Sequence, residues 1–330
     1  MTLTLGMNGF GRIGRYLTRL LVDDPDLKLG AINARSDNET YAHLLKYDSV
    51  YGRFGPEVSW NEHGIVVNGR DIPLTHWNNP QESNWKDLGC ELVVETTGKF
   101  KDRESCQGHL DGGAGKVVIS APGKGVDVSI CPNVNDQAYD PSAHHIISCG
   151  SCTTNCLAPV CKVLNDNFGI SHGYATTIHS YTMTQRILDG SHKDLRRARA
   201  AAMSQIPTTT GATKAVGEIL PELDGKLDGM AVRVPTPSGS LIDLVCELEK
   251  TVTPEKVNQI FKENVQETLG YTEEPLVSVD FLGDSHGAVV DAMSTRVMNG
   301  TMVKVLAWYD NEAGFTHQLL RLLRRVARDL

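Results

Sequence analysis

The chain has 330 residues, of which 40% are apolar and 22% are charged, a composition that suits a globular protein of two domains. Its 40 acidic side chains outnumber 32 basic ones, and the formal charge of −8 argues against a general nucleic-acid-binding or membrane-surface protein. No run approaches 18 apolar residues and no basic, then apolar, leader is visible, so we expect no membrane span, no export and a cytoplasmic location.

The first 150 residues alternate short apolar runs with helical stretches. We expect a strand over residues 3–6 and a helix over residues 12–23. Strands alternating with helices or loops build a mostly parallel sheet, so we predict an α/β domain over residues 1–150. The further strand-like runs of this domain cover residues 28–33, 91–95, 116–120, 127–131 and 145–148.

The second half carries longer runs rich in β-branched residues, which favour a largely antiparallel sheet covered by helices. We predict an α+β domain over residues 151–314, with one helix at residues 254–268. An amphipathic helix over residues 315–330 is expected to pack back on the first domain. The expected strands cover residues 173–181, 230–250, 276–281, 288–294 and 301–309.

A glycine loop joins the first strand to the first helix. Residues 9–14 read G-F-G-R-I-G, and this pattern between a strand and a helix is typical of a Rossmann dinucleotide-binding site. The glycines permit a tight turn close to a pyrophosphate, and the helix N-terminus supplies free N–H groups. The acidic residue that usually follows about 20 positions later is absent, because Ala34, Arg35 and Ser36 stand there.

The segment around Cys152 is the candidate catalytic site. Ser151 is a suitable N-cap, which would place Cys152 in the first turn of a helix, and His179 is the candidate base. We expect the helix start and an imidazole to lower the pKa of the thiol. With no export signal, the eight cysteines are expected to be reduced, and Cys149 and Cys161 to be buried apolar residues.

Metal binding is an alternative for this segment, since Cys149, Cys152, Cys156 and Cys161 fall within thirteen residues. No second C-x2-C pair follows, and Cys161 lies on a different helix face from Cys152 and Cys156. We therefore predict no metal site.

These motifs, with four further segments, resemble the phosphorylating glyceraldehyde-3-phosphate dehydrogenase family. The resemblance extends from residue 2 to the end of the chain, and the cysteine and W-Y-D-N-E segments are its most specific parts. The segments that carry it are residues 8–15, 43–49, 151–159, 207–212, 233–237 and 308–312.

The resemblance implies reversible, phosphorylating oxidation of glyceraldehyde 3-phosphate to 1,3-bisphosphoglycerate through a Cys152 thioester, with His179 as base. It implies a homotetramer, with the loop over residues 180–204 at a subunit interface. The substrate phosphate would meet Thr182 and Arg233, with help from Arg197, and attacking phosphate would meet Ser151, Thr153, Thr210 and Gly211.

The same resemblance implies a nicotinamide cofactor. The residues expected to line its site are Gly9, Phe10, Gly11, Arg12, Ile13, Ala34, Arg35, Ser120, Ser191 and Asn311. Ala34 replaces the usual Asp, and Gly190-Ser191 is similar to the NADP-using photosynthetic members of the family. We therefore expect NADP to be used at least as well as NAD, although Asp37 or Glu39 could substitute for the missing carboxylate.

Two other functions stay open. Erythrose-4-phosphate dehydrogenase shares the Cys–His pair but hydrolyses its thioester, and a paralogue without catalysis would only bind a nucleotide or RNA. The intact phosphate-site segment and the acidic charge favour the phosphorylating glyceraldehyde-3-phosphate dehydrogenase prediction over both alternatives. Its ligands would be glyceraldehyde 3-phosphate and phosphate. Arsenate, which mimics phosphate, is a further possible acceptor.

Overall fold

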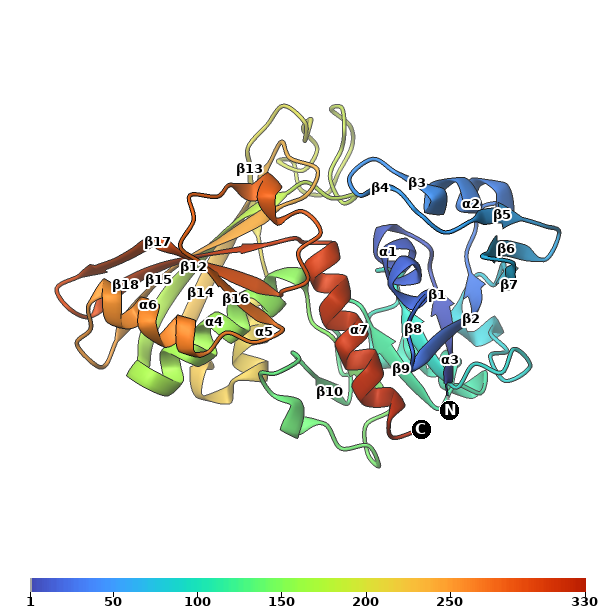
Figure 1. Ribbon diagram of the computed structural model, residues 1–330, viewed down its shortest axis with the longest axis horizontal. Coiled ribbons are helices and arrows are strands. Elements are labelled where there is room, and N and C mark those ends of the chain that lie inside the picture. Colours follow the sequence, from blue (N-terminus) through green and yellow to red (C-terminus); the bar gives the residue numbers. More distant parts are fainter. Residues whose placement is uncertain (1) are drawn as a thin grey trace. The chain divides into compact units, whose positions relative to one another are not determined.

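The computed structural model describes residues 2–330 and divides into two compact units. The first comprises residues 2–130, 136–150 and 319–330, and the second comprises residues 131–135 and 151–318. Each unit is built around one large sheet (Figure 1).

The first unit contains a nine-stranded sheet in the order β10-β11-β9-β8-β1-β2-β7-β6-β5. Neighbouring strands from β10 to β7 run parallel, whereas β7, β6 and β5 form an antiparallel meander at one edge. The strands are β1 (Leu3–Asn8), β2 (Leu27–Asn33), β5 (Val58–Trp60), β6 (Gly64–Val67), β7 (Arg70–Thr75), β8 (Leu92–Glu95), β9 (Lys116–Ile119), β10 (Val128–Ser129) and β11 (Ile146–Ser148).

Helices connect the parallel strands of this unit, as the alternating pattern predicts. The central strands are buried on both faces: every residue of β8 and β9 is buried, as is usual for a parallel sheet covered on both sides. The connecting elements are α1 (Arg12–Leu21), α2 (Asn38–Lys46), α3 (Arg103–Asp111), the short pair β3 (Tyr47–Asp48) and β4 (Gly52–Arg53), and the 3-10 turns η1 (Pro80–Glu82) and η2 (Asp136–Ala138).

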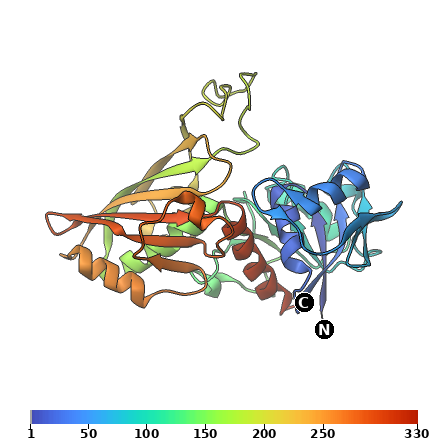
Figure 2. The same ribbon diagram turned by 45° about the horizontal axis from the view of Figure 1, so that its top comes forward.

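The second unit contains a seven-stranded, largely antiparallel sheet in the order β13-β14-β12-β15-β18-β17-β16. Two pairs in it, β12 with β14 and β16 with β17, are parallel. The strands are β12 (Ile170–Ser180), β13 (Ile206–Thr209), β14 (Leu227–Val234), β15 (Ser240–Leu248), β16 (Leu269–Thr272), β17 (Ala288–Met298) and β18 (Met302–Tyr309). The segment between β12 and β13 projects away from the sheet (Figure 2).

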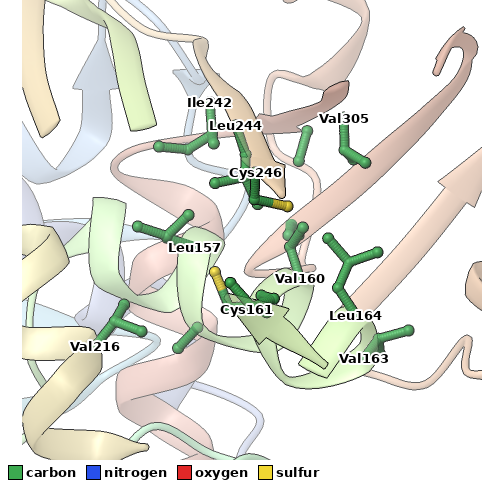
Figure 3. Packing of buried hydrophobic residues seen from close by; sticks show 14 of the residues in the cluster. Leu157, Val160, Cys161, Val163, Leu164, Val216, Ile242, Leu244, Cys246 and Val305 are labelled. Carbon is green, nitrogen blue, oxygen red and sulfur yellow. The ribbon is translucent and has the colours of Figure 1, made fainter. Parts of the chain in front are cut away.

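One face of this sheet is covered by helices, and β15 accordingly alternates between buried and partly exposed residues. Leu157, Val160 and Leu164 of the long helix pack with Ile242 and Leu244 of β15 in the core (Figure 3). The helical elements of the unit are α4 (Cys152–Phe168), α5 (Ala212–Ile219), α6 (Pro254–Glu263), η3 (Pro221–Leu223) and η4 (Ser278–Phe281). A last helix, α7 (Ala313–Ala327), begins in the second unit and ends among the residues assigned to the first.

The predicted fold class is confirmed, but three expected elements of the second unit differ. The run over residues 230–250 forms two strands, because Pro235 and Pro237 cannot donate to a ladder and Gly239 turns with φ +87°. The helix expected to reach residue 268 ends at Glu263, where the Asn264 side chain donates to Ile260 O at 2.8 Å. Its expected last residues lead into β16 instead.

The strand expected over residues 276–281 is wrong. The segment forms η4, because the Asp280 carboxylate accepts the Val277 N–H at 2.8 Å and closes a local turn. Its alternating apolar residues suggested a strand, yet Phe281 stacks on Trp308 from within that turn, with 5.4 Å between ring centroids. No helix among residues 2–330 is long and apolar enough to cross a membrane.

Candidate active site

The start of α4 presents Cys152. Ser151 is the N-cap, as predicted, and its hydroxyl accepts the Thr154 N–H at 3.0 Å. Gly150 precedes it with φ +68°, a left-handed conformation that favours glycine. Cys152 is partly buried, whereas Cys149 and Cys161 are buried, as expected.

His179 comes from the end of β12 and lies beside the thiol. Its Nε2 is 3.4 Å from the Cys152 Sγ, within the range of a sulfur hydrogen bond. Its Nδ1 is 2.8 Å from Ser180 O. A base at Nε2 requires the tautomer that carries its proton on Nδ1, where it can donate to this carbonyl and leave the Nε2 lone pair toward the thiol. The other tautomer would instead accept a hydrogen bond at Nδ1 from the Arg233 guanidinium, whose Nη1 is 2.7 Å away.

Arg233 joins the pair through strand register. Parallel pairing of β12 with β14 sets His179 opposite Arg233, and the guanidinium Nη1 lies 2.7 Å from His179 Nδ1 and 2.8 Å from Ser180 O. Arg233 is the cation nearest the Cys–His pair in these contacts. A single fixed positive charge therefore acts on both the thiol and the imidazole.

The electrostatics of the pair differ from the sequence expectation. Burial raises the pKa of the Cys152 thiol, and the Arg233 charge opposes that shift only in part. Burial, and then the Arg233 charge, lowers the pKa of His179 to about 3. The expected lowering of the thiol pKa is thus wrong for this state of the site: the pair is a neutral thiol beside a neutral imidazole.

Tyr309 is a part of the site that the sequence analysis did not single out. Its hydroxyl lies 3.0 Å from Thr153 Oγ1 and 2.8 Å from Thr177 Oγ1, and its ring meets His179 edge to face with 5.8 Å between centroids. The residue is buried, and burial raises the pKa of its phenol. It fixes one side of the imidazole and connects the start of α4 to β12. Its position inside the W-Y-D-N-E segment was the available signal.

The residues expected to bind anions lie in the second unit with these groups. Ile206 of β13 pairs with Arg233 of β14. Arg197 Nε donates to the hydroxyl of Thr208, also on β13, at 2.8 Å. The charge of Arg197 lowers the pKa of Arg233, after burial as the larger cause. Two guanidinium groups in electrostatic contact are a suitable place for an anion, although Asp194 is 3.6 Å from Arg197.

The remaining expected anion ligands mostly have local partners. Thr153 Oγ1 contacts Tyr309, Thr182 Oγ1 contacts Thr184 at 2.9 Å, and Thr210 Oγ1 accepts the Ala212 N–H at 3.2 Å. Gly211 is the N-cap of α5 and nothing lies within 4 Å of where its Cβ would be.

The glycine loop of the first unit fits a dinucleotide. Gly9 has φ +101°, and a Cβ there would lie 2.7 Å from Thr97 N. A Cβ on Gly14 would lie 2.6 Å from Gly9 O, whereas a Cβ on Gly11 would meet nothing within 4 Å. The first and third glycines therefore serve packing, and the second leaves the backbone open to a ligand, as the pyrophosphate motif requires.

The other expected cofactor residues of this unit lie around the carboxyl ends of the strands. Phe10 is buried and Ile13 is partly buried, while the Arg12 guanidinium pairs with Asp48. Ala34 follows β2 and is bonded by its backbone to Thr75 and His76, and the Ser120 N–H donates to Glu95 O at 2.9 Å.

Two expected cofactor residues belong to the second unit. Asn311 is buried and its Oδ1 accepts the Ser240 hydroxyl at 2.9 Å, which orients its amide. Ser191 is exposed on the projecting segment, where its carbonyl accepts two hydrogen bonds from Arg186. Among residues 2–330 no cluster of three or more His, Cys, Asp or Glu side chains could hold a metal ion.

Two domain models of one family match the two parts of the chain. Residues 3–103 match the model of the glyceraldehyde 3-phosphate dehydrogenase NAD binding domain, and residues 151–311 match that of its C-terminal domain. The chain belongs to this dehydrogenase family. The family prediction is confirmed, and with it the class of enzyme, an NAD-dependent oxidoreductase.

Curated members of the family cover the whole chain. Glyceraldehyde-3-phosphate dehydrogenase of Geobacillus stearothermophilus is 54% identical over 99% of both chains. Glyceraldehyde-3-phosphate dehydrogenase 1 of Bacillus subtilis (strain 168) is 50% identical over 99% of both. The enzyme of Streptomyces coelicolor is 49% identical over 100% of both.

Proposed function

We propose that this enzyme oxidises glyceraldehyde 3-phosphate to an acyl phosphate through a thioester on Cys152. The observation that carries the proposal is a contact of 3.4 Å between Cys152 Sγ, at the start of α4, and Nε2 of His179, which is buried and neutral. A thiol there can pass its proton to the imidazole as the sulfur adds to an aldehyde carbon. Family membership supports the same reaction.

The steps follow from these groups. Addition of the sulfur gives a hemithioacetal, whose hydroxyl proton leaves to His179 as a hydride leaves the former aldehyde carbon. A bound nicotinamide would supply the acceptor for that hydride, and loss of the hydride would leave a thioester on Cys152. The oxygen of inorganic phosphate then attacks the thioester carbon, the Cys152 thiolate leaves, and the acyl phosphate is released. The Cys152 N–H, in the first turn of α4, is the proposed donor to the oxyanion formed in both additions.

Arg233 and Arg197 are the proposed ligands of the substrate phosphate, with Thr182, and Ser151, Thr153, Thr210 and Gly211 those of attacking phosphate. The two guanidinium groups supply charge for a dianion, and bidentate contacts would orient it. An anion on Arg233 would also offset the charge that depresses the pKa of His179. Substrate binding would thus make His179 a stronger base when the aldehyde arrives.

We also propose that NADP serves at least as well as NAD. Ala34 offers no carboxylate to the ribose hydroxyls, and Arg35 follows it directly. The glycine loop, Arg12, Ile13 and Ser120 are the proposed ligands of the dinucleotide in the first unit. Asn311 and Ser191 are proposed for the nicotinamide amide and the 2′-phosphate, respectively.

A homotetramer in the cytoplasm completes the proposal. The projecting segment exposes the apolar side chains of Met183, Ile187, Leu188, Leu195 and Met203, each at least 76% accessible. Exposed apolar patches of this kind mark protein interfaces.

Steady-state kinetics with both cofactors, with and without phosphate, test the reaction. We expect turnover of glyceraldehyde 3-phosphate that depends on phosphate, and that arsenate can support in its place. A rate on erythrose 4-phosphate that needs no phosphate would instead identify a hydrolysing dehydrogenase. Absence of any turnover, with cofactor still bound, would indicate a binding protein.

A further inference from the structure

The turn after β2 holds a group of polar atoms that the proposed reaction does not use. The backbone N–H groups of Arg35 and Ser36 both donate to the Tyr41 hydroxyl, each at 3.2 Å. The Tyr41 ring meets Phe10 of the glycine loop edge to face, with 5.3 Å between centroids. Tyr41 therefore connects the glycine loop to the end of the second strand, where Rossmann enzymes contact the adenosine ribose.

The hydrogen bonds of Tyr41 define its chemistry toward a ligand. Its oxygen accepts two N–H groups, which occupies its lone pairs and leaves the O–H hydrogen to donate. In the described chain this hydrogen has no acceptor. Two donors on one oxygen also polarise the O–H bond, so the hydroxyl is a better donor to an anion.

The charges nearby favour the same kind of ligand. The Arg35 side chain is exposed, and its one contact is Nη2 donating to Asn78 O at 3.3 Å. Among residues 2–330 it has no carboxylate partner. The turn thus offers a guanidinium and a hydroxyl as donors, and a phosphate monoester has the oxygens to accept from both.

The carboxylate of Asp37 does not replace the missing acidic residue. It is the N-cap of α2 and accepts the Thr40 N–H and the Thr40 hydroxyl at 2.8 Å each. These bonds hold the pKa of Asp37 below its usual value. The Ser36 hydroxyl also donates to it, at 3.2 Å. Turning Asp37 toward a ribose would leave α2 uncapped, so Asp37 is not a ready acceptor for the diol of NAD.

We propose that Tyr41 determines cofactor specificity: its hydroxyl, together with the Arg35 guanidinium, recognises a phosphate monoester on the ribose 2′-oxygen. This rests on the proposed use of a nicotinamide dinucleotide. A ribose hydroxyl can also accept from these donors, but a phosphate monoester is charged and accepts more strongly, so donors in the turn favour the phosphate. The assignment places discrimination on a residue of α2 as well as on the position of Ala34.

Calorimetric titration of the whole protein with NADP and NAD tests this, with adenosine 2′,5′-bisphosphate and ADP as matched fragments. The Tyr41→Phe change keeps the ring on Phe10 and removes the hydroxyl. We expect the NADP dissociation constant to rise about tenfold, the loss of one hydrogen bond to a charged group, with NAD changed less than about twofold. Arg35→Gln should weaken NADP by at least the same factor.

Tyr47→Phe is the control, since this half-exposed tyrosine of the same unit lies on β3, and it should leave both constants unchanged. Equal weakening of NADP and NAD by Tyr41→Phe would mean that the hydroxyl only supports the turn. Tighter NADP binding by that variant would mean that the hydroxyl blocks the N–H groups. Either result overturns the assignment. Failure of the underlying function looks different, because then the parent binds neither dinucleotide.

Discussion

Replacing Arg233 with Gln should raise the pKa of His179 without removing the base. The guanidinium Nη1 lies 2.7 Å from His179 Nδ1, and its charge is the second cause, after burial, of a pKa of about 3. Two like charges about 4 Å apart repel by at most about 4 kcal/mol at an effective dielectric constant of about 20, which is close to three pKa units. Burial is the larger cause of the shift and persists in the variant, so we expect a smaller rise in the pKa of His179, of about one unit.

The sign of the shift follows from the charge. A cation beside the imidazole disfavours protonation, so its removal lets His179 hold a proton at higher pH and lose its function as base there. The same change removes a charge that favours the Cys152 thiolate, so the pKa of the thiol should also rise.

The assay uses D-glyceraldehyde, which has no phosphate to bind Arg233, and follows the first turnover of reduced cofactor against pH. The acid limb of this profile reports the group that must be deprotonated. It should lie about one unit higher in Arg233→Gln than in the parent. Arg296→Gln, a charge removed from β17, is the matched control and should not move it. An acid limb unchanged in Arg233→Gln would show that burial alone keeps His179 neutral.

Three further predictions concern the thiols, the site's supports and assembly. Inactivation by iodoacetamide should track modification of Cys152 in peptide maps, because the other seven cysteines are buried; tracking of Cys156 would refute the assignment. Ser151→Ala should lower the free energy of unfolding by about 1 kcal/mol through the lost cap. Tyr309→Phe should lower it by about 1–3 kcal/mol, because two threonine hydroxyls lose their shared partner. A free energy of unfolding equal to that of the parent in chemical denaturation would contradict either prediction. Light scattering should give a tetramer, and a fully active monomer would rule out a required subunit interface.

Features encoded by neighbouring residues were predictable from the sequence. The glycine loop and the N-cap at Ser151 each depend on a few consecutive residues, and both have the expected structure. Local competition also explains the failure at residues 276–281, where one carboxylate closes a turn that an apolar pattern does not reveal.

Features that depend on distant parts of the chain were not predictable in the same way. Arg233 reaches His179 through the register of two strands, and Tyr309 reaches Thr153 and Thr177 from another strand of the same sheet. The pKa of Cys152 depends on how deeply this packing buries the helix start, whereas the sequence shows only the helix start. The sequence analysis therefore expected a lowered pKa for the Cys152 thiol, because it did not include the effect of burial, which raises that pKa.

The covalent thioester is the central claim, and mass spectrometry of the intact enzyme measures it most directly. The protein is mixed with glyceraldehyde 3-phosphate and oxidised cofactor in a phosphate-free buffer, quenched in acid and digested. We predict a phosphoglyceryl adduct on the peptide that contains Cys152, absent from Cys152→Ala and discharged within one turnover when phosphate is added before the quench. Reduced cofactor formed with no adduct on Cys152, or with the adduct on another residue, would contradict the mechanism.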